Sequence, residues 1–306
     1  MRSLLVAGLF IAALQGGARA QVQCNLASDL GGKTDANSIG LLERLKGTVA
    51  MEGNNTCSGA LVTFQGRSSS SPALVLSAGH CSDRGKLRLP LKTGSIAVMA
   101  HGEALYRTAY RRPLTLDTGR TDAPRTCIEA EEAVYATLTG GDILLLRLTE
   151  TYSDIERRTG VTPFVISQDS SFSPGLAIRM PSSLWQTDRE CQVEATVEKL
   201  QEYGWLWGPV LRLRVDMDTC IAPQGVSGAP AIRKDTKEVI GVMGTVSDAS
   251  AGPCELNNPC EVGADGSVRA TPKDQNYMHF VHQLYACLDA SRSLDLAVPG
   301  CPLAKP

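Results

Sequence analysis

Residues 224–230, Gln-Gly-Val-Ser-Gly-Ala-Pro, place Ser227 between two glycines, and apolar strand-like segments lie on both sides. Segment 210–217 alternates apolar and charged residues, and segment 239–246 follows a Lys- and Asp-rich turn, so we expect the serine on a loop between strands. Glycines allow backbone conformations closed to other residues and let a substrate approach closely. The amides of Gly225 and Ser227 can then converge on one point, as an oxyanion hole requires. An ordinary Gly-Ser turn fits this stretch equally well.

A candidate base and a candidate orienting acid lie upstream of this serine. Segment 74–81 is an apolar strand that ends in His80, next to a cysteine. Segment 140–148 places Asp142 at the start of another apolar strand. The order His80, Asp142, Ser227 is one of the known chain orders of a Ser-His-Asp triad. Each of the three residues has an ordinary structural explanation alone, but all three fall at the expected place relative to a strand.

These three segments resemble the catalytic blocks of chymotrypsin-like serine proteases, particularly the secreted bacterial, glutamyl-endopeptidase-like branch. The matching stretches are SAGHC at 77–81, DILLLRL at 142–148 and GVSGAP at 225–230. The resemblance implies an all-β fold of two six-stranded antiparallel barrels, with the triad in the cleft between them. It also implies acyl transfer, in which His80 is the base, Asp142 holds the imidazole tautomer and Ser227 attacks a peptide carbonyl. No cofactor is needed for this chemistry.

The N-terminus has the pattern of a secretory signal. Arg2 precedes an apolar segment at 4–14, and residues 18–20, Ala-Arg-Ala, form a small-x-small cleavage site. The apolar segment is shorter than the roughly 20 residues that a membrane span needs. We therefore expect residues 1–20 to be cleaved and the mature protein to be secreted, either extracellular or periplasmic. A core helix at 4–14 is the alternative.

Charge and composition limit the classes of partner. The formal net charge of the 306 residues is −2, whereas nucleic-acid binding draws on a basic excess or stripe. The resemblance implies polypeptide substrates, and a proteinaceous inhibitor is a further candidate partner. We expect a monomer with no membrane span and no nucleic-acid partner.

Ten cysteines behind a signal segment indicate disulfides in an oxidising compartment. The chain has no CxxC pair and no HExxH, so we expect no metal site. The resemblance pairs Cys57 with Cys81 beside the catalytic histidine, and a loop of this size is worth roughly 3 kcal/mol. We further expect Cys220 to pair with Cys254 or Cys260. The sequence does not determine the disulfide partners of five cysteines: Cys24, Cys127, Cys191, Cys287 and Cys301.

Short apolar segments between turns are typical of a barrel or sandwich and not of βαβ units. One set comprises 48–51, 60–64, 73–77, 95–101 and 143–148, and the second comprises 164–166, 176–180, 192–200, 210–217, 229–233 and 239–246. The two sets predict two barrels. We place an N-terminal arm or short propeptide at 21–44, the barrels at 45–155 and 156–290, and a tail at 291–306.

A C-terminal α-helix is predicted from residue 274 to about 290. Its apolar residues recur at spacings of three and four, which gives one stripe: Tyr277, Phe280, Val281, Leu284 and Leu288. His279 and His282 lie three apart on this helix, and we assign them to solvent or helix packing. They have no third metal ligand nearby in the sequence.

The resemblance also places the primary specificity pocket. Ile221 stands six residues before the serine, where trypsin-like enzymes have an aspartate, so a cationic substrate side chain would lack a counter-charge. Met243 stands where glutamyl-specific enzymes have a histidine. We therefore predict an apolar or small pocket lined by Ile221, Ala222, Met243 and Gly244. A slip of one or two residues in the alignment would instead bring Asp216 or Asp218 into the pocket and favour basic side chains.

Val226, the residue before the serine, indicates whether activation depends on a newly cleaved N-terminus. Trypsin-like members have an aspartate there that pairs with a freshly cleaved N-terminal amine, and Val226 forms no ion pair. No Arg-Ile-Val-Gly-Gly cleavage block is present. We expect the oxyanion loop to form without an N-terminal insertion switch, and an inhibitory arm at 21–44 remains an open alternative.

Three other functions compete with a peptidase. A catalytically silent homologue would act as a binding module, but such proteins usually lose a triad residue, and all three are present here. A doubly wound hydrolase needs G-x-S-x-G, which Ala229 breaks, and the order Ser, Asp, His. A protease-fold esterase would share the triad, and only substrate assays separate it from a peptidase.

Overall fold

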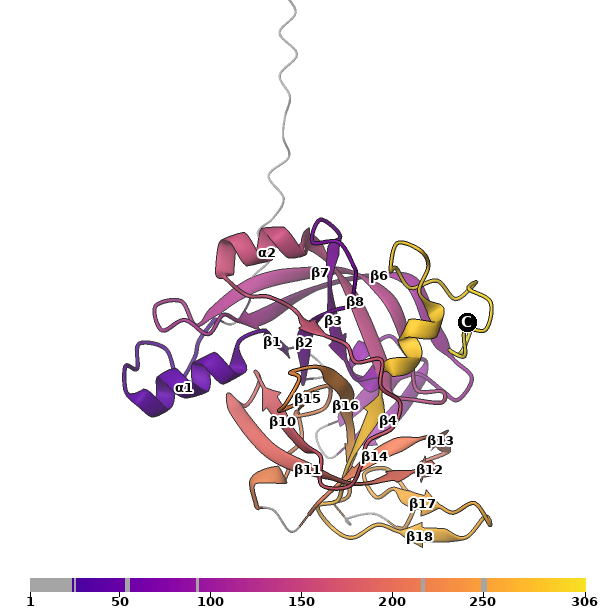
Figure 1. Ribbon diagram of the computed structural model, residues 1–306. Helices are drawn as coiled ribbons and strands as arrows, with labels where there is room; N and C mark the ends of the chain where they lie inside the picture. Colours follow the sequence, from indigo (N-terminus) through magenta and orange to yellow (C-terminus); the bar gives the residue numbers. More distant parts are fainter. Residues whose placement is uncertain (1–23, 25, 53–55, 92–93, 216–217, 249–251) are drawn as a thin grey trace, which may run out of the picture.

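The computed structural model describes residues 24, 26–52, 56–91, 94–215, 218–248 and 252–306. The predicted signal segment at 1–20 lies outside these residues. In Figure 1, the strands labelled β3, β6, β7 and β8, from the first half of the chain, lie above those labelled β10, β11, β14, β15 and β16, from the second half. Each half forms a β-barrel.

The N-terminal barrel has six antiparallel strands in the order β1-β6-β7-β8-β3-β2, and pairing of β1 with β2 closes it. The strands are β1 (Thr48–Met51), β2 (Cys57–Thr63), β3 (Pro72–Ser77), β6 (Ala104–Asp117), β7 (Arg125–Thr137) and β8 (Ile143–Thr151). The short strand β9 (Phe164–Val165) adds to β2 in parallel. Side chains of β2 and β3 and of the first four residues of β8 are almost all buried, which explains the continuous apolar sequence of these stretches.

The C-terminal barrel is closed in the order β10-β11-β14-β19-β16-β15. Its strands are β10 (Ala177–Ser182), β11 (Thr187–Val197), β14 (Val210–Leu213), β15 (Pro230–Arg233), β16 (Val239–Val246) and β19 (Asn276–Phe280). If the six strands of each barrel are numbered in chain order, both rings read 1-2-3-6-5-4. The predicted fold class, two six-stranded antiparallel barrels, is confirmed.

Two smaller sheets lie outside the barrels. Strands β4 (Leu87–Leu91) and β5 (Gly94–Val98) form a hairpin. The order β13-β12-β17-β18 describes a four-stranded sheet made of β12 (Lys199–Glu202), β13 (Trp205–Trp207), β17 (Cys260–Val262) and β18 (Val268–Ala270). The indoles of Trp205 and Trp207 donate to the carbonyls of Met99 and Leu138, so β13 is attached to the N-terminal half.

The predicted C-terminal α-helix is wrong. Residues 276–280 form β19, and a 3₁₀ helix, η3 (His282–Cys287), follows. Strand β19 pairs with both β14 and β16, and all five of its residues are buried. A strand buried on both faces has no polar alternation, and the apparent helical stripe joined residues of two different elements.

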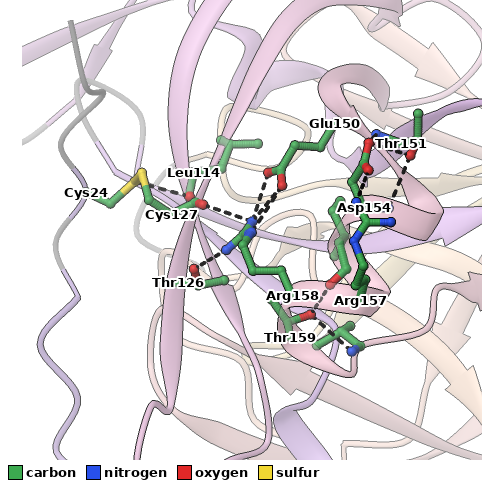
Figure 2. A network of polar contacts seen from close by, with 12 residues as sticks. Cys24, Leu114, Thr126, Cys127, Glu150, Thr151, Asp154, Arg157, Arg158 and Thr159 are labelled. Atoms are coloured by element: carbon green, nitrogen blue, oxygen red, sulfur yellow. Dashed lines mark hydrogen bonds and ion pairs between the residues drawn. A yellow bond between two sulfur atoms is a disulfide. The ribbon is translucent and has the colours of Figure 1, made fainter.

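Two α-helices lie in segments where the sequence predicted none. Helix α1 (Ala36–Leu45) begins at the N-cap Asp35, whose carboxylate accepts from the amide of Ser38. Helix α2 (Tyr152–Thr159) begins with a capping box in which Thr151 and Asp154 bind each other's amides. Figure 2 shows this cap.

Arg158 joins helix α2 to the N-terminal barrel. Its guanidinium reaches the carboxylate of Glu150 at 2.8 Å and the hydroxyl of Thr126 (Figure 2). The residue after Thr126 is Cys127, which forms a disulfide with Cys24. The described start of the chain is therefore attached covalently to β7.

All ten cysteines form disulfides. The predicted bridge between Cys57 and Cys81 is present. The predicted partners of Cys220 are wrong, because Cys220 is bonded to Cys191, and Cys254 and Cys260 are bonded to each other. Strand β11 lies against the 3₁₀ turn η2 (Asp218–Cys220), and this approach of two distant segments has no signal in the spacing. The remaining pairs are Cys24 with Cys127 and Cys287 with Cys301.

Candidate active site

His80 and Asp142 form a close pair at one end of the N-terminal barrel. Strands β3 and β8 are antiparallel, with Ser77 opposite Leu144, so the end of β3 lies beside the start of β8. His80 follows β3 in the 3₁₀ turn η1 (Gly79–Ser82), and Asp142 directly precedes β8. The His80 Nδ1 atom is 2.6 Å from Asp142 Oδ2, and the backbone amide of His80 donates to Oδ1 at 2.9 Å. Both carboxylate oxygens therefore bind the same residue.

Gly79 makes this approach possible. A Cβ atom at this position would lie 2.1 Å from the carbonyl oxygen of Thr137 and 3.0 Å from Asp142 Oδ1. A side chain here would push the η1 turn away from the carboxylate. Glycine at position 79 is therefore required for the close packing of His80 and Asp142.

The electrostatics of the pair favour an ionised carboxylate and a basic imidazole. Burial would raise the pKa of Asp142, but the charge of His80 and its hydrogen bonds hold that pKa below its usual value. Burial would lower the pKa of His80, but the Asp142 charge and hydrogen bond raise it above its usual value. The Asp142 side chain is 2% exposed and that of His80 is 24% exposed, so only the imidazole is open to solvent.

The loop that carries Ser227 comes from the C-terminal barrel and is bound by the N-terminal one. The amide of Ser58 on β2 donates to the carbonyl oxygen of Ser227 at 2.8 Å. The Ser58 hydroxyl donates to the carbonyl oxygen of Gly225 at 3.2 Å. Ser58 follows Cys57, whose disulfide partner Cys81 is adjacent to His80. The histidine segment and the serine loop are therefore held by the same part of β2.

Gly228 shows how close the two segments lie. Its φ is +80°, and a Cβ atom would lie 2.1 Å from the hydroxyl of Ser77 and 2.8 Å from the amide nitrogen of Ala78. These two residues immediately precede Gly79 and His80. The backbone next to Ser227 is thus packed against the segment that carries the histidine, and only glycine fits.

The backbone around Gly225 suits an anion-binding role. Gly225 has a φ of +89°, in the region that favours glycine. Among the described residues, the amides of Gly225 and Ser227 have no hydrogen-bond acceptor. The amide of Val226, between them, donates to the carbonyl of Pro223. Two free donors in a partly exposed loop can receive a ligand oxygen.

The four residues predicted for the specificity pocket lie in different environments. Ala222 and Met243 are buried in one apolar cluster of the C-terminal barrel. Ile221 is 43% exposed, and its carbonyl oxygen accepts from Arg189. Gly244 lies next to His279. The structure therefore brings Ala222 and Met243 together and leaves Ile221 at the surface.

His279 lies beside the aspartate, a position that no pattern in the sequence predicted. A Cβ atom on Gly244 would lie 2.3 Å from His279 Nε2 and 3.5 Å from Asp142 Oδ2. The ring meets Trp207 edge-on at 4.9 Å between centroids, and its Nε2 has no hydrogen-bond partner among the described residues. Burial lowers the pKa of His279 to about 4, so the ring is neutral at pH 7. It is a strand residue, and not the helix residue that the sequence predicted.

Glu202 is a second unexpected ionisable group near the pair. Its side chain is buried at the end of β12, and Oε1 accepts from the amide of Asn257 at 2.9 Å. Burial raises the pKa of Glu202 to about 7, with further electrostatic contributions from His80 and Asp142. A glutamate in a short polar strand gives no sequence signal of this kind.

Within the described part of the chain, one group of side chains has metal-ligand spacing: Cys57, His80 and Cys81. Both sulfur atoms belong to a disulfide, so neither is a thiolate that could bind a metal. This group is therefore not a metal site. Every helix in the described ranges is too short or too polar to cross a bilayer.

No protein-family model and no curated protein matches this chain. Solved structures that are similar to it include the active form of the Rv3671c protease from M. tuberculosis, with 13% identity, coverage of 96% of this chain and 97% of that chain, and a TM-score of 0.44. The MamO protease domain from Magnetospirillum magneticum is 15% identical, and the match covers 77% of this chain and 92% of that chain with a TM-score of 0.43. Mouse neuropsin, a serine protease, is 13% identical, and the match covers 78% of this chain and 90% of that chain with a TM-score of 0.40.

Proposed function

We propose that the protein is a secreted serine endopeptidase that uses Ser227, His80 and Asp142. One observation carries the proposal: the bound pair of His80 and Asp142 lies against the loop of Ser227, through Ser58 and Gly228. The two halves of the site come from different barrels, which leaves the junction between the barrels for a substrate. Disulfide bonding of all ten cysteines supports export to an oxidising compartment.

The proposed reaction is acyl transfer. His80 Nε2 removes the proton of the Ser227 hydroxyl as its oxygen attacks the peptide carbonyl carbon, and then gives that proton to the leaving amine. Asp142 fixes the imidazole, since Nδ1 is its donor and Nε2 remains the base. Water then attacks the acyl-enzyme with His80 again as base, and the acid product leaves.

The amides of Gly225 and Ser227 are the proposed oxyanion hole. The negatively charged oxygen of the tetrahedral intermediate would displace solvent and accept hydrogen bonds from these two amides. One such donor is worth about 3–4 kcal/mol in the transition state. For specificity, we propose that the substrate residue before the cleaved bond has an apolar or small side chain. Of the predicted pocket residues, Ala222 and Met243 belong to the apolar cluster of the C-terminal barrel.

A fluorophosphonate probe tests the proposal directly. The mature, disulfide-intact protein should be labelled at Ser227, and peptide mapping should locate the adduct there. A Ser171→Ala variant is the matched control, because Ser171 is exposed and lies outside the site. Absence of labelling in the wild-type protein would contradict the proposal and favour a silent homologue that acts as a binding module. Labelling with hydrolysis of esters but not of casein would favour an esterase.

A further inference from the structure

Cys24 and residues 26–45, which from here on are called the N-terminal arm, connect the two barrels. One end is bonded to the N-terminal barrel through the Cys24–Cys127 disulfide. At the other end, Arg44 of α1 lies 3.0 Å from the carboxylate of Asp188 on β11. Arg179 of β10 binds the same carboxylate at 2.9 Å and donates to the carbonyl oxygen of Arg44. The Asp188 side chain is 1% exposed, so this contact is a buried attachment and not a loose surface pair.

The middle of the arm binds the turn that joins β10 to β11. Gln186 in this turn accepts from the amide of Asp29 at 2.8 Å and donates to the hydroxyl of Ser28 at 2.8 Å. Its φ is +48°, a conformation that non-glycine residues adopt only where their surroundings support it. The arm provides that support through both ends of the Gln186 amide.

A buried arginine joins the arm, the turn and the N-terminal barrel. The guanidinium of Arg125 donates to the carbonyl oxygen of Ala27 at 2.8 Å and to that of Ser183. Its Nε donates to the carboxylate of Asp117 at 3.2 Å. The arm and the turn 183–186 are therefore fixed to each other at more than one point.

The other side of this turn contacts the loop of the proposed nucleophile. The indole of Trp185 donates to the carbonyl oxygen of Gln224 at 2.9 Å. A Cβ atom on Gly225 would lie 2.7 Å from the Leu184 side chain and 3.2 Å from Trp185 Nε1. Ser182, at the end of β10, shares a hydrogen bond of 2.7 Å with Ser58, the residue that binds the carbonyl of Gly225. The turn thus packs directly on the glycine whose amide would bind the oxyanion.

We propose that the N-terminal arm is a permanent brace of the oxyanion loop, and that Gln186 and Trp185 are positioning residues for the amides of Gly225 and Ser227. The inference rests on the proposed function of those amides. It assigns the arm a role opposite to that of an inhibitory propeptide, because the chain loses activity when the arm is released. No new N-terminal amine takes part, since the contacts use the interior of the arm and Val226 is buried in an apolar cluster.

Two variants test the brace in the full, disulfide-intact protein. Gln186→Ala removes the contacts of this side chain to Ser28 and Asp29 of the arm, and Trp185→Phe keeps an aromatic ring and removes the donor to Gln224. We expect kcat to fall roughly 10- to 100-fold in each, with KM changed less than about threefold, because a loss of transition-state binding appears in kcat. The control is Gln168→Ala, which removes an exposed hydrogen bond to Gln65 that lies outside the turn. The control should stay within about twofold of wild type.

Hydrogen exchange gives a readout that does not need activity. Amides in peptides covering 221–229 should exchange faster in Gln186→Ala than in wild type and in the Gln168→Ala control. The downfield Nδ1 proton of His80 should be unchanged, because its bond to Asp142 lies within the N-terminal barrel. Unchanged exchange and unchanged kcat in Gln186→Ala would overturn the brace, as would higher activity in a form cleaved between the arm and the barrels.

These outcomes separate the brace from the proposed function. If the wild-type protein is not labelled at Ser227, the proposed function fails. Faster exchange of 221–229 in Gln186→Ala would then still show that the arm orders this loop. If labelling succeeds and exchange is unchanged, the brace alone fails.

Discussion

The two barrels have the same strand order but hold their parts of the candidate site in different ways. The N-terminal barrel positions His80 and Asp142 with its own strands, and the two residues bind each other through two hydrogen bonds. The C-terminal barrel presents Ser227 on a loop that is held by Ser58 of β2, from the other barrel, and by its own turn 183–186, to which the N-terminal arm is bound. One half of the site is built by local geometry, and the other depends on assembly of the whole chain.

This difference has a physical cause. A strand end is fixed by the hydrogen bonds of the ladder, whereas a glycine-rich loop has few internal contacts and large conformational freedom. Such a loop keeps one geometry only if neighbouring segments bind it. We therefore expect substitutions around the loop to change kcat and to leave the geometry of the His80–Asp142 pair nearly unchanged.

The largest effect should come from the residues that we propose for the chemical step. Ser227→Ala or His80→Ala should lower kcat by several orders of magnitude, because triad members act as one unit. Neither variant should unfold, since Ser227 is bound through its backbone and Cys81 still anchors the histidine segment. Casein hydrolysis and circular dichroism measure the two properties. Variants with wild-type activity would show that other residues perform the reaction.

Asp142→Asn tests the N-terminal half of the comparison. The neutral amide removes the charge that raises the pKa of His80, so kcat should fall roughly 10³- to 10⁴-fold. A protonated His80 cannot act as base, and the acidic limb of the pH–rate profile reports its pKa. That limb should lie above the ordinary histidine pKa in the wild-type protein and move to lower pH in the variant. A limb at the same pH in both proteins would contradict the assignment.

Gly228→Ala tests the C-terminal half. The new Cβ atom would meet the hydroxyl of Ser77 at 2.1 Å, and the residue must also keep a φ of +80°. Gly266→Ala is the matched control, because Gly266 has the same φ and nothing within 4 Å of the added atom. We expect Gly228→Ala to lower kcat at least about 100-fold and to cost roughly 2 kcal/mol more stability than the control. Equal effects of the two variants would show that the loop does not depend on contact with β3.

The sequence was sufficient to predict some parts of this molecule. The strands Thr48–Met51 and Val239–Val246 coincide with predicted segments, because continuous apolar residues in short runs indicate buried strands. The double-barrel class followed from the two sets of such runs. The sequence placed His80 and Asp142 at strand ends, and the antiparallel ladder of β3 and β8 brings these two ends together.

Other parts had no local signal. The longest strands, β6 and β7, were not predicted, because many charged side chains lie on their exposed faces and β6 has an irregular register between Ala109 and Arg112. Long-range contacts were equally hidden, since Ser28 and Gln186 are 158 residues apart. The position of His279 beside Asp142 depends on the pairing of β16 with β19. Tertiary structure decides such contacts, and neither spacing nor composition reveals them.

The smallest effect on the proposed reaction concerns Glu202, which lies near the pair of His80 and Asp142. Its pKa is about 7 in the folded protein, above the ordinary value of 4.5, because burial disfavours the charged form. A group with a raised folded pKa stabilises the protein below the unfolded pKa, and this stability is lost as pH rises through the folded value. Wild type should therefore lose stability between pH 4.5 and about 7 through this residue.

Glu202→Gln removes this titration and keeps an oxygen for the amide of Asn257. Relative to wild type, the variant should gain on the order of 2–3 kcal/mol in unfolding free energy between pH 4.5 and pH 8. Chemical denaturation at the two pH values measures the gain, and Glu156→Gln on the exposed side of α2 is the control. Since His80 and Asp142 contribute to the pKa of Glu202, its titration should also shift in Asp142→Asn. An equal difference between Glu202→Gln and wild type at both pH values would show that Glu202 does not titrate in this range.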